Sequence, residues 1–290
     1  SQFGSSNITA VVHGNNLFVA AGASGKISTS TDGETWVART PPHSAAIVDA
    51  AFGVGLFVTL ATDELWTSPD GVNWTSRVSG FGSNTALTID FVNNRFLATA
   101  VIGGVTRVAS SLDGIAWTLE TQSITGVCNG IAFQNDIYIL LTSDGNAHIS
   151  SDALTWVANP DAALNNGTDI SAGRGNFLVS TSDGKSAISE DGVTWTAGNP
   201  STSVALVAHI DGLFLICGNN ERVDISPDGI DPWTNVNSGV GGSYKAMTSG
   251  NGTLVIAGDS GSLLSADIYN YAGSTVAHSE NGENQYIRIS

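Results

Sequence analysis

The chain has 290 residues, of which 41% are hydrophobic and only 12% charged, so it has enough apolar material for a core and too little charge for a disordered polymer. Ten basic residues against 26 acidic ones give a formal charge of −16, which would repel nucleic acid and anionic membranes, so neither is expected as a partner. No apolar run reaches the roughly 18 residues of a membrane span and no leader-like segment opens the chain at Ser1, so it is expected to be soluble.

The first predicted elements are two apolar strands around a Gly-Asn turn. Residues 8–12 alternate apolar and small side chains, Gly14-Asn15-Asn16 forms the turn, and residues 17–20 form the second strand. The same pair recurs along the chain. Equivalent second strands begin near Leu56, Phe96, Tyr138, Phe177, Phe214 and Leu254.

A box of the form Ser-x-Asp-Gly-x-x-Trp follows each pair of strands. Four copies are nearly complete: Ser30, Asp32 and Trp36; Ser68, Asp70 and Trp74; Ser111, Asp113 and Trp117; Ser189, Asp191 and Trp195. Three are degenerate: Ser150, Asp152 and Trp156, with Ala153 for Gly; Ser226, Asp228 and Trp233, with one inserted residue; Ser265, Asp267 and Tyr271. The aspartates of successive copies lie 37 to 43 residues apart, which indicates an internal repeat.

The residue types of the box predict a hairpin turn. The carboxylate of an Asp-Gly pair accepts nearby backbone N–H groups, and the glycine adopts a positive φ at little cost. The following Trp opens the outermost strand, where burial of about 150–250 Å² would stabilise the fold by roughly 4–6 kcal/mol before entropy. We therefore expect each box Trp to be buried between adjoining repeats.

Four short strands per unit of about 40 residues are typical of a β-propeller blade. The sequence predicts an all-β fold, a single seven-bladed propeller over residues 1–274 with four antiparallel strands per blade and under about 5% helix. The blades are expected near 8–39, 47–77, 86–120, 128–159, 168–198, 204–236 and 244–274. Residues 275–290 fall outside the repeat as a C-terminal hairpin that could close the ring, pair with another chain or lead into a partner.

These boxes resemble the Asp-box, or BNR, repeat of bacterial sialidases, sortilin-type receptors and the photosystem II assembly factor. The Gly-Asn-x-Leu-Phe-Val-Ala stretch at residues 14–20 with the following box is also similar to repeats of secreted bacterial and phage virion-associated proteins. In that family the boxes lie on blade hairpins away from the active site. The resemblance thus implies a fold and an extracellular or virion-surface location, and says little about activity.

A search for chemistry finds no catalytic residues. A sialidase would need an Arg-Ile-Pro motif, which is absent, although a carboxylate pair for glycoside hydrolysis could come from distant blades. The histidines and cysteines lack metal-ligand spacing, so neither a metal nor a cofactor is expected. Cys128 and Cys217 are expected as free buried thiols, and His13 and His209 as packed replacements for a repeated Phe.

Binding residues are expected on the face opposite the boxes, where loops are longest. Six of the ten basic residues are predicted there as ligand-binding residues: Lys26, Arg39, Arg77, Arg107, Lys185 and Arg222. Trp66 and Phe81 are the aromatic candidates for stacking on a sugar. The alternatives are that the cations pair with acids such as Glu221 and Glu64, and that both rings are packed.

Three further carboxylates are expected near the central channel. Asp49 and Asp169 share one repeat position near the start of the innermost strand, and Asp90 stands two residues further along that face. They could hold a cation or water, or serve as hydrogen-bonded structural groups.

The preferred function is a non-catalytic recognition module that binds a glycan or protein receptor on a bacterial or virion surface. The alternative is a structural or assembly scaffold that packs against other chains, for example in a virion. A glycoside hydrolase of sialidase-like type is the second alternative. The sequence does not indicate an oligomeric state.

Overall fold

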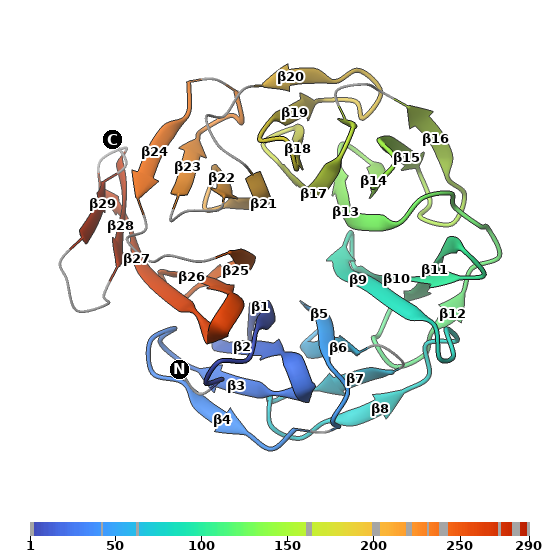
Figure 1. The fold of residues 1–290 in the computed structure, drawn as a ribbon, viewed down its shortest axis with the longest axis horizontal. Helices are drawn as coiled ribbons and strands as arrows, with labels where there is room; N and C mark the ends of the chain where they lie inside the picture. The colour runs from blue at the N-terminus through green and yellow to red at the C-terminus, as the bar shows by residue number, and fades with distance from the viewer. Residues whose placement is uncertain are drawn as a thin grey trace.

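Each repeat folds into one antiparallel sheet, and seven sheets surround a central axis in the computed structural model (Figure 1). The structure describes the chain apart from residues 1–2, 42, 62–63, 161–163, 199–203, 219–221, 231, 238–242, 272–273, 280–284 and 289–290. Of residues 160, 204–205, 222, 236–237, 267–271, 274–279 and 285–288 it describes the backbone alone. The predicted seven-bladed, almost helix-free fold is confirmed.

The first three blades each have four strands in chain order from the channel outward. Blade 1 contains β1 (Ile8–Gly14), β2 (Leu17–Gly22), β3 (Ile27–Ser30) and β4 (Val37–Arg39), with a short 3-10 turn, η1 (Ala23–Gly25), before β3. Blade 2 contains β5 (Ile47–Gly53), β6 (Leu56–Ala61), β7 (Leu65–Ser68) and β8 (Thr75–Arg77). Blade 3 contains β9 (Thr85–Val92), β10 (Arg95–Ile102), β11 (Val105–Ser111) and β12 (Thr118–Leu119).

The next three blades repeat this order, and the seventh adds a strand. Blade 4 contains β13 (Cys128–Gln134), β14 (Ile137–Thr142), β15 (Asn146–Ser150) and β16 (Val157–Pro160). Blade 5 contains β17 (Gly167–Gly173), β18 (Asn176–Thr181), β19 (Ser186–Ser189) and β20 (Thr196–Gly198). Blade 6 contains β21 (Val204–Ile210), β22 (Leu213–Gly218), β23 (Arg222–Ser226) and β24 (Thr234–Asn237). Blade 7 contains β25 (Tyr244–Gly250), β26 (Thr253–Gly258), η3 (Asp259–Gly261), β27 (Leu263–Tyr271), β28 (Ser274–Ser279) and β29 (Gln285–Arg288).

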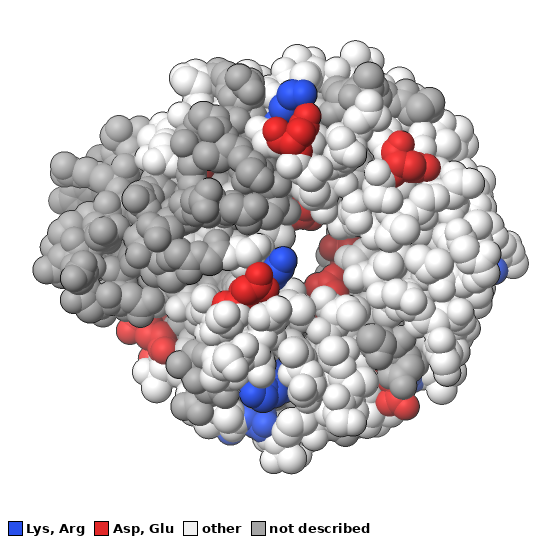
Figure 2. Space-filling model, viewed as in Figure 1, with Lys and Arg blue, Asp and Glu red and all other residues white. Residues whose placement is uncertain are grey.

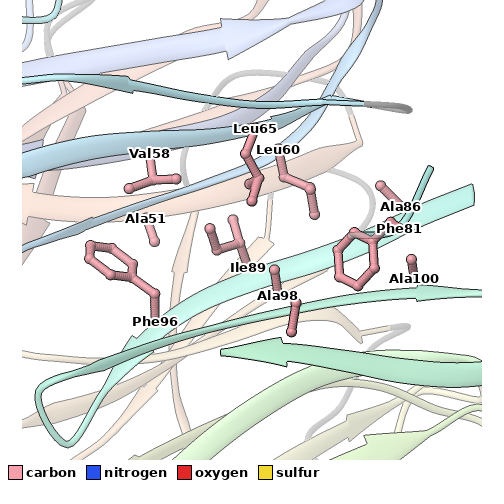
Figure 3. Packing of buried hydrophobic residues seen from close by; sticks show 11 residues of the cluster. Ala51, Val58, Leu60, Leu65, Phe81, Ala86, Ile89, Phe96, Ala98 and Ala100 are labelled. Atoms are coloured by element: carbon pink, nitrogen blue, oxygen red, sulfur yellow. The ribbon is translucent and has the colours of Figure 1, made fainter. Parts of the chain in front are cut away.

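The hydrophobic core lies between the blades. Seven clusters of buried residues each combine side chains from two adjoining blades. In the cluster between blades 2 and 3, Val58 and Leu60 of β6 pack against Ile89 of β9 and Phe96 of β10 (Figure 3). Because each blade buries its apolar faces only against its neighbours, the ring must close for every face to be covered.

Six of the seven boxes form the predicted turn. In blade 1, Asp32 Oδ1 accepts the backbone N–H groups of Glu34 at 2.9 Å and Thr35 at 2.8 Å, and the Ser30 hydroxyl donates to the same oxygen at 2.7 Å. The serine-to-aspartate bond recurs in all six turns, at Asp32, Asp70, Asp113, Asp152, Asp191 and Asp228.

The six box tryptophans pack across the blade interface, but only Trp156 and Trp195 are fully buried as predicted, and the other four are half-buried. Trp74 of blade 2 lies against a cluster that includes Val19 and Ile27 of blade 1, and Trp195 of blade 5 lies against Ile139 of blade 4. Trp36, Trp117, Trp156 and Trp233 contact the preceding blade in the same way. Each outer strand is thus anchored to the neighbouring sheet.

The expectation of a seventh box turn is corrected by the structure. β27 runs unbroken through Ser265, Asp267 and Tyr271, pairing with β26 on one side and β28 on the other. The position held by glycine in five of the other turns, and by Ala153 in the sixth, is Ile268, and a β-branched residue is strongly disfavoured at the positive φ that the turn requires. The fourth strand of blade 7 is therefore β28, from the segment expected to form a separate hairpin.

Among the described residues no strand of blade 1 enters the sheet of blade 7, so the two blades that close the ring meet by packing face to face. Phe3, Ile8 and Phe18 share a cluster with Val255 and Ala257 of β26. Across the same interface, the Asn251 side chain donates to the Thr31 carbonyl at 3.1 Å and the Ser260 N–H donates to Asn7 Oδ1 at 3.0 Å.

Candidate functional site

The ring encloses a central channel. It has a volume of about 420 Å³ and is lined by the innermost strands of all seven blades. Figure 2 shows its opening, with acidic side chains in the wall. The lining includes Asp49, Asp90 and Asp169, so the structure brings together the three carboxylates that the sequence places near the channel.

Two of these carboxylates bridge adjoining blades. Asp49 of blade 2 accepts the N–H of Ile89 in blade 3 at 2.8 Å, and Asp169 of blade 5 accepts the N–H of Val207 in blade 6 at 3.0 Å. Each also accepts the N–H of the following residue, at 2.8 Å. Asp49 and Asp169 each follow a register shift in their strand, which interrupts the backbone hydrogen bonds of the sheet and leaves amides free to bind a carboxylate.

Burial among the blades raises the pKa of all three carboxyls. Burial raises the pKa of Asp49 to about 6 and that of Asp169 to about 7, although the backbone amides act in the opposite direction. The pKa of Asp90 lies well above its usual range because of burial and the neighbouring charges of Asp49 and Asp169. Asp90 also receives the Thr88 hydroxyl at 3.3 Å. These partners favour a structural role for the channel acids.

Nothing in the described part of the chain forms a metal-binding group of three or more His, Cys, Asp or Glu side chains. Cys128 and Cys217 are free and buried, as predicted, and burial raises the pKa of Cys128 to about 12. His13 packs on Phe18 with ring centroids 4.5 Å apart, matching the Phe52–Phe57 pair at 4.8 Å. His209 packs on Phe214 in the same way.

No helix in the described part of the chain is long and apolar enough to cross a membrane.

Two of the predicted cationic residues occupy equivalent places in adjoining blades. Arg39 ends β4 and its Nε donates to Thr29 Oγ1 at 2.8 Å; Arg77 ends β8 and its Nε donates to Thr67 Oγ1 at 3.0 Å. Within the described residues neither guanidinium forms an ion pair, and Glu64 forms none either. Each arginine is thus oriented by its own blade, and no acid of the described residues forms an ion pair with it.

The other predicted cations are held differently. Lys26 Nζ donates to the Phe3 carbonyl and to Ser6 Oγ, each at 2.9 Å, and Lys185 forms an ion pair with Asp183 at 2.8 Å. Arg107 Nη2 donates to the Glu120 carbonyl. The side chain of Arg222, like Glu221, lies outside the described residues. On the face in view in Figure 2, the visible Lys and Arg side chains appear as separate spots.

The two aromatic candidates are both packed. Phe81 is only 3% exposed and belongs to the cluster between blades 2 and 3 (Figure 3), so the expectation that it stacks on a sugar is corrected. Trp66 is half-buried, and His43 stacks on it with ring centroids 5.2 Å apart.

Sequence reasoning missed two groups of residues. Lys245 lines the channel, and its Nζ lies 3.9 Å from Asp259 Oδ2. Its position as the second residue of the innermost strand could have indicated in the sequence that it lies near the channel. Turn asparagines also link blades: Asn15 donates to the Gly55 and Pro69 carbonyls at 3.1 and 3.0 Å, and Asn135 makes the equivalent bonds. Their recurrence in the Gly-Asn turns was visible, but their partners in the next blade were not.

Comparison with known proteins supports the fold. The structure of YCF48 bound to D1 peptide is similar with a TM-score of 0.74 and 17% identity, over 90% of this chain and 93% of that chain. Virginiamycin B lyase from Staphylococcus aureus has a TM-score of 0.76 and 8% identity, over 89% and 94%. The WD40 propeller domain of Doa1 has a TM-score of 0.71 and 10% identity, over 90% and 92%.

No protein-family model matches the chain, and no curated protein sequence matches it. These three structures share less than a fifth of their sequence with this chain, so they establish the seven-bladed architecture and leave the activity open. They include a peptide-bound propeller and a lyase, which shows that this architecture carries both binding and catalysis.

Proposed function

We propose that this propeller is a non-catalytic recognition module that holds a glycan or protein receptor on a bacterial or virion surface. The observation that carries the proposal is the pair Arg39 and Arg77. The two guanidiniums are oriented by the same hydrogen bond in adjoining blades and form no ion pair within the described chain. A pre-oriented guanidinium can bind a carboxylate or sulfate through two N–H groups.

The channel supports binding over catalysis. An acid or base catalyst must reach a substrate, whereas Asp49 and Asp169 each hold two backbone amides. That YCF48 is known with a bound peptide adds support for a protein partner. The six box turns with the same hydrogen bonds also support our proposal that the repeat belongs to the Asp-box family.

A structural scaffold is the second candidate. Its supporting observation is β29, a fifth strand at the outer edge of blade 7, where the other blades have four. An outer strand with an unpaired edge can pair with another chain.

The test is a screen of the isolated chain against arrays of acidic and neutral glycans and of bacterial surface proteins. We expect binding to an acidic ligand that falls about tenfold or more in Arg39→Gln/Arg77→Gln, since each bidentate contact contributes roughly 1–3 kcal/mol. Arg174→Glu is the matched control, because it changes the net charge equally in an exposed turn of the box side. Equal binding by both variants, or release of sugar from a glycoside panel, would overturn the proposal.

A further inference from the structure

Two clefts on the box side of the ring are built from the same repeat positions. One, of about 490 Å³, lies between the box turn of blade 3 and Leu154 of blade 4. The other, of about 340 Å³, lies between the box turn of blade 5 and Ile230 of blade 6. Each is lined by a box serine and aspartate of one blade, and by the residue two positions after the box aspartate of the next blade.

That second position is aliphatic and exposed in five consecutive turns. The exposed fractions are 41% for Val72, 47% for Ile115, 38% for Leu154, 52% for Val193 and 51% for Ile230. Single exposed aliphatic side chains are ordinary on protein surfaces. Five at one repeat position on one side of a ring form an arc of apolar contacts, which marks an interaction surface.

The charge beside these aliphatic side chains is negative. In the six box turns each aspartate is exposed and uses Oδ1 for the turn. Hydrogen bonds from the turn amides hold the pKa of Asp113, Asp152 and Asp191 below the usual range. The cleft between blades 5 and 6 has Glu190 as well and no cation, while the cleft between blades 3 and 4 has both Glu120 and Arg95. The arc is therefore anionic at neutral pH.

We propose that the box side of blades 1 to 6 is a docking surface for a cationic protein segment with aliphatic side chains. The clefts take the aliphatic side chains, and the box aspartates and Glu190 pair with Lys or Arg. Charge complementarity selects this occupant: a second copy of this chain, with its formal charge of −16, would bring the same carboxylates to the interface. The surface is separate from Arg39 and Arg77, so the inference does not depend on the proposed function.

The test uses fluorescence anisotropy with three synthetic peptides of four triplets each: Leu-Arg-Gly, Leu-Glu-Gly and Gly-Arg-Gly. We expect the Leu-Arg-Gly peptide to bind most tightly and the Leu-Glu-Gly peptide not to bind. Leu154→Ser/Ile230→Ser should weaken binding of Leu-Arg-Gly by about tenfold, because it removes the apolar contact from both clefts.

Val78→Ser/Val127→Ser is the matched control. These valines are 84% and 41% exposed in blade-to-blade loops, away from the clefts, and their loss should leave the affinity unchanged. Equal affinity for the Gly-Arg-Gly peptide would mean charge attraction alone and would overturn the inference. So would an absence of binding, or an unchanged affinity in the cleft variant with its melting temperature intact.

Discussion

His13 in the first blade packs directly against Gly250 in the seventh, at the junction that closes the ring. A Cβ at Gly250 would overlap the imidazole ring, and the same contact recurs between Gly14 and Phe52 and between Gly173 and His209. Gly250 does not have a positive φ, so glycine is needed there for room and not for its backbone freedom.

Gly250→Ala should therefore loosen the closure. We expect the free energy of unfolding to fall by about 1–3 kcal/mol, the range for overpacking a filled site. Urea denaturation measures the loss, and His13→Ala/Gly250→Ala should recover part of it relative to the sum of the single changes. A Gly250→Ala protein as stable as the original would show that this contact does not close the ring.

The box turns should act on stability and not on recognition by Arg39 and Arg77. Asp113 Oδ1 accepts the N–H groups of Ile115 and Ala116 at 2.8 and 2.9 Å. Asp113→Ala leaves both without their partner and should cost about 0.5–1.5 kcal/mol in thermal or urea unfolding, because water can reach these exposed amides. Asp113→Asn retains one acceptor and should cost less. Loss of binding to the acidic array ligand at an unchanged melting temperature would instead assign the box turn a role in that recognition.

The tryptophans should differ in what their N–H groups contribute. Trp36 Nε1 donates to the Gly33 carbonyl at 2.9 Å, whereas the buried Trp156 Nε1 has no partner among the described residues. Both Trp→Phe changes remove the same atoms, and Trp36→Phe also breaks a hydrogen bond. We expect Trp36→Phe to cost about 1 kcal/mol more than Trp156→Phe. Equal losses in matched urea titrations would contradict this assignment.

Stability should be greatest in mildly acidic solution. Hydrogen bonds lower the pKa of Asp32 to about 2 despite some burial, so its contribution is present above pH 4 and is lost as the pH falls toward 2. The channel acids have the opposite effect on the pH dependence of stability. With pKa values raised from 3.8 to about 6 for Asp49 and about 7 for Asp169, the folded state binds more protons, and stability falls as the pH rises from 4 through 7.

Asp90→Asn tests the channel contribution. The substitution removes a charge that lies near Asp49 and Asp169. We therefore expect the free energy of unfolding to rise by about 1–2 kcal/mol at pH 8, a moderate value because the channel is open to solvent, and to change little at pH 4.5. Asp144→Asn, in an outer turn where hydrogen bonds lower the pKa, should not stabilise at pH 8. A denaturation profile that is flat between pH 5 and pH 8 would count against charge accumulation in the channel.

Local patterns predicted the parts of the fold that depend on short-range chemistry. Ser-x-Asp-Gly specifies the turn through bonds within six residues, so its geometry at Asp32 or Asp113 follows directly from sequence. The seventh box failed because Ile268 replaces the glycine, a difference that the spacing of Ser265, Asp267 and Tyr271 conceals.

Contacts between blades were harder to predict from the sequence. The spacing placed Asp49 and Asp169 near the channel, but their acceptance of amides from the next blade depends on how neighbouring sheets align. Phe81 looked like an exposed loop residue because a loop sequence does not reveal which side chains fold back under it. The aliphatic residue two positions after the box aspartate was visible in five of the repeats, but its place in a cleft was visible only in the structure.

The most direct test of recognition through Arg39 and Arg77 is the salt dependence of binding to the array ligand with the highest affinity. Affinity should fall with salt for the original chain and for Arg174→Glu, and the slope should be clearly shallower for Arg39→Gln/Arg77→Gln, with the ligand recovered chemically unchanged. The same slope in all three proteins, or recovery of a cleaved ligand, would contradict a non-catalytic module that binds through these arginines.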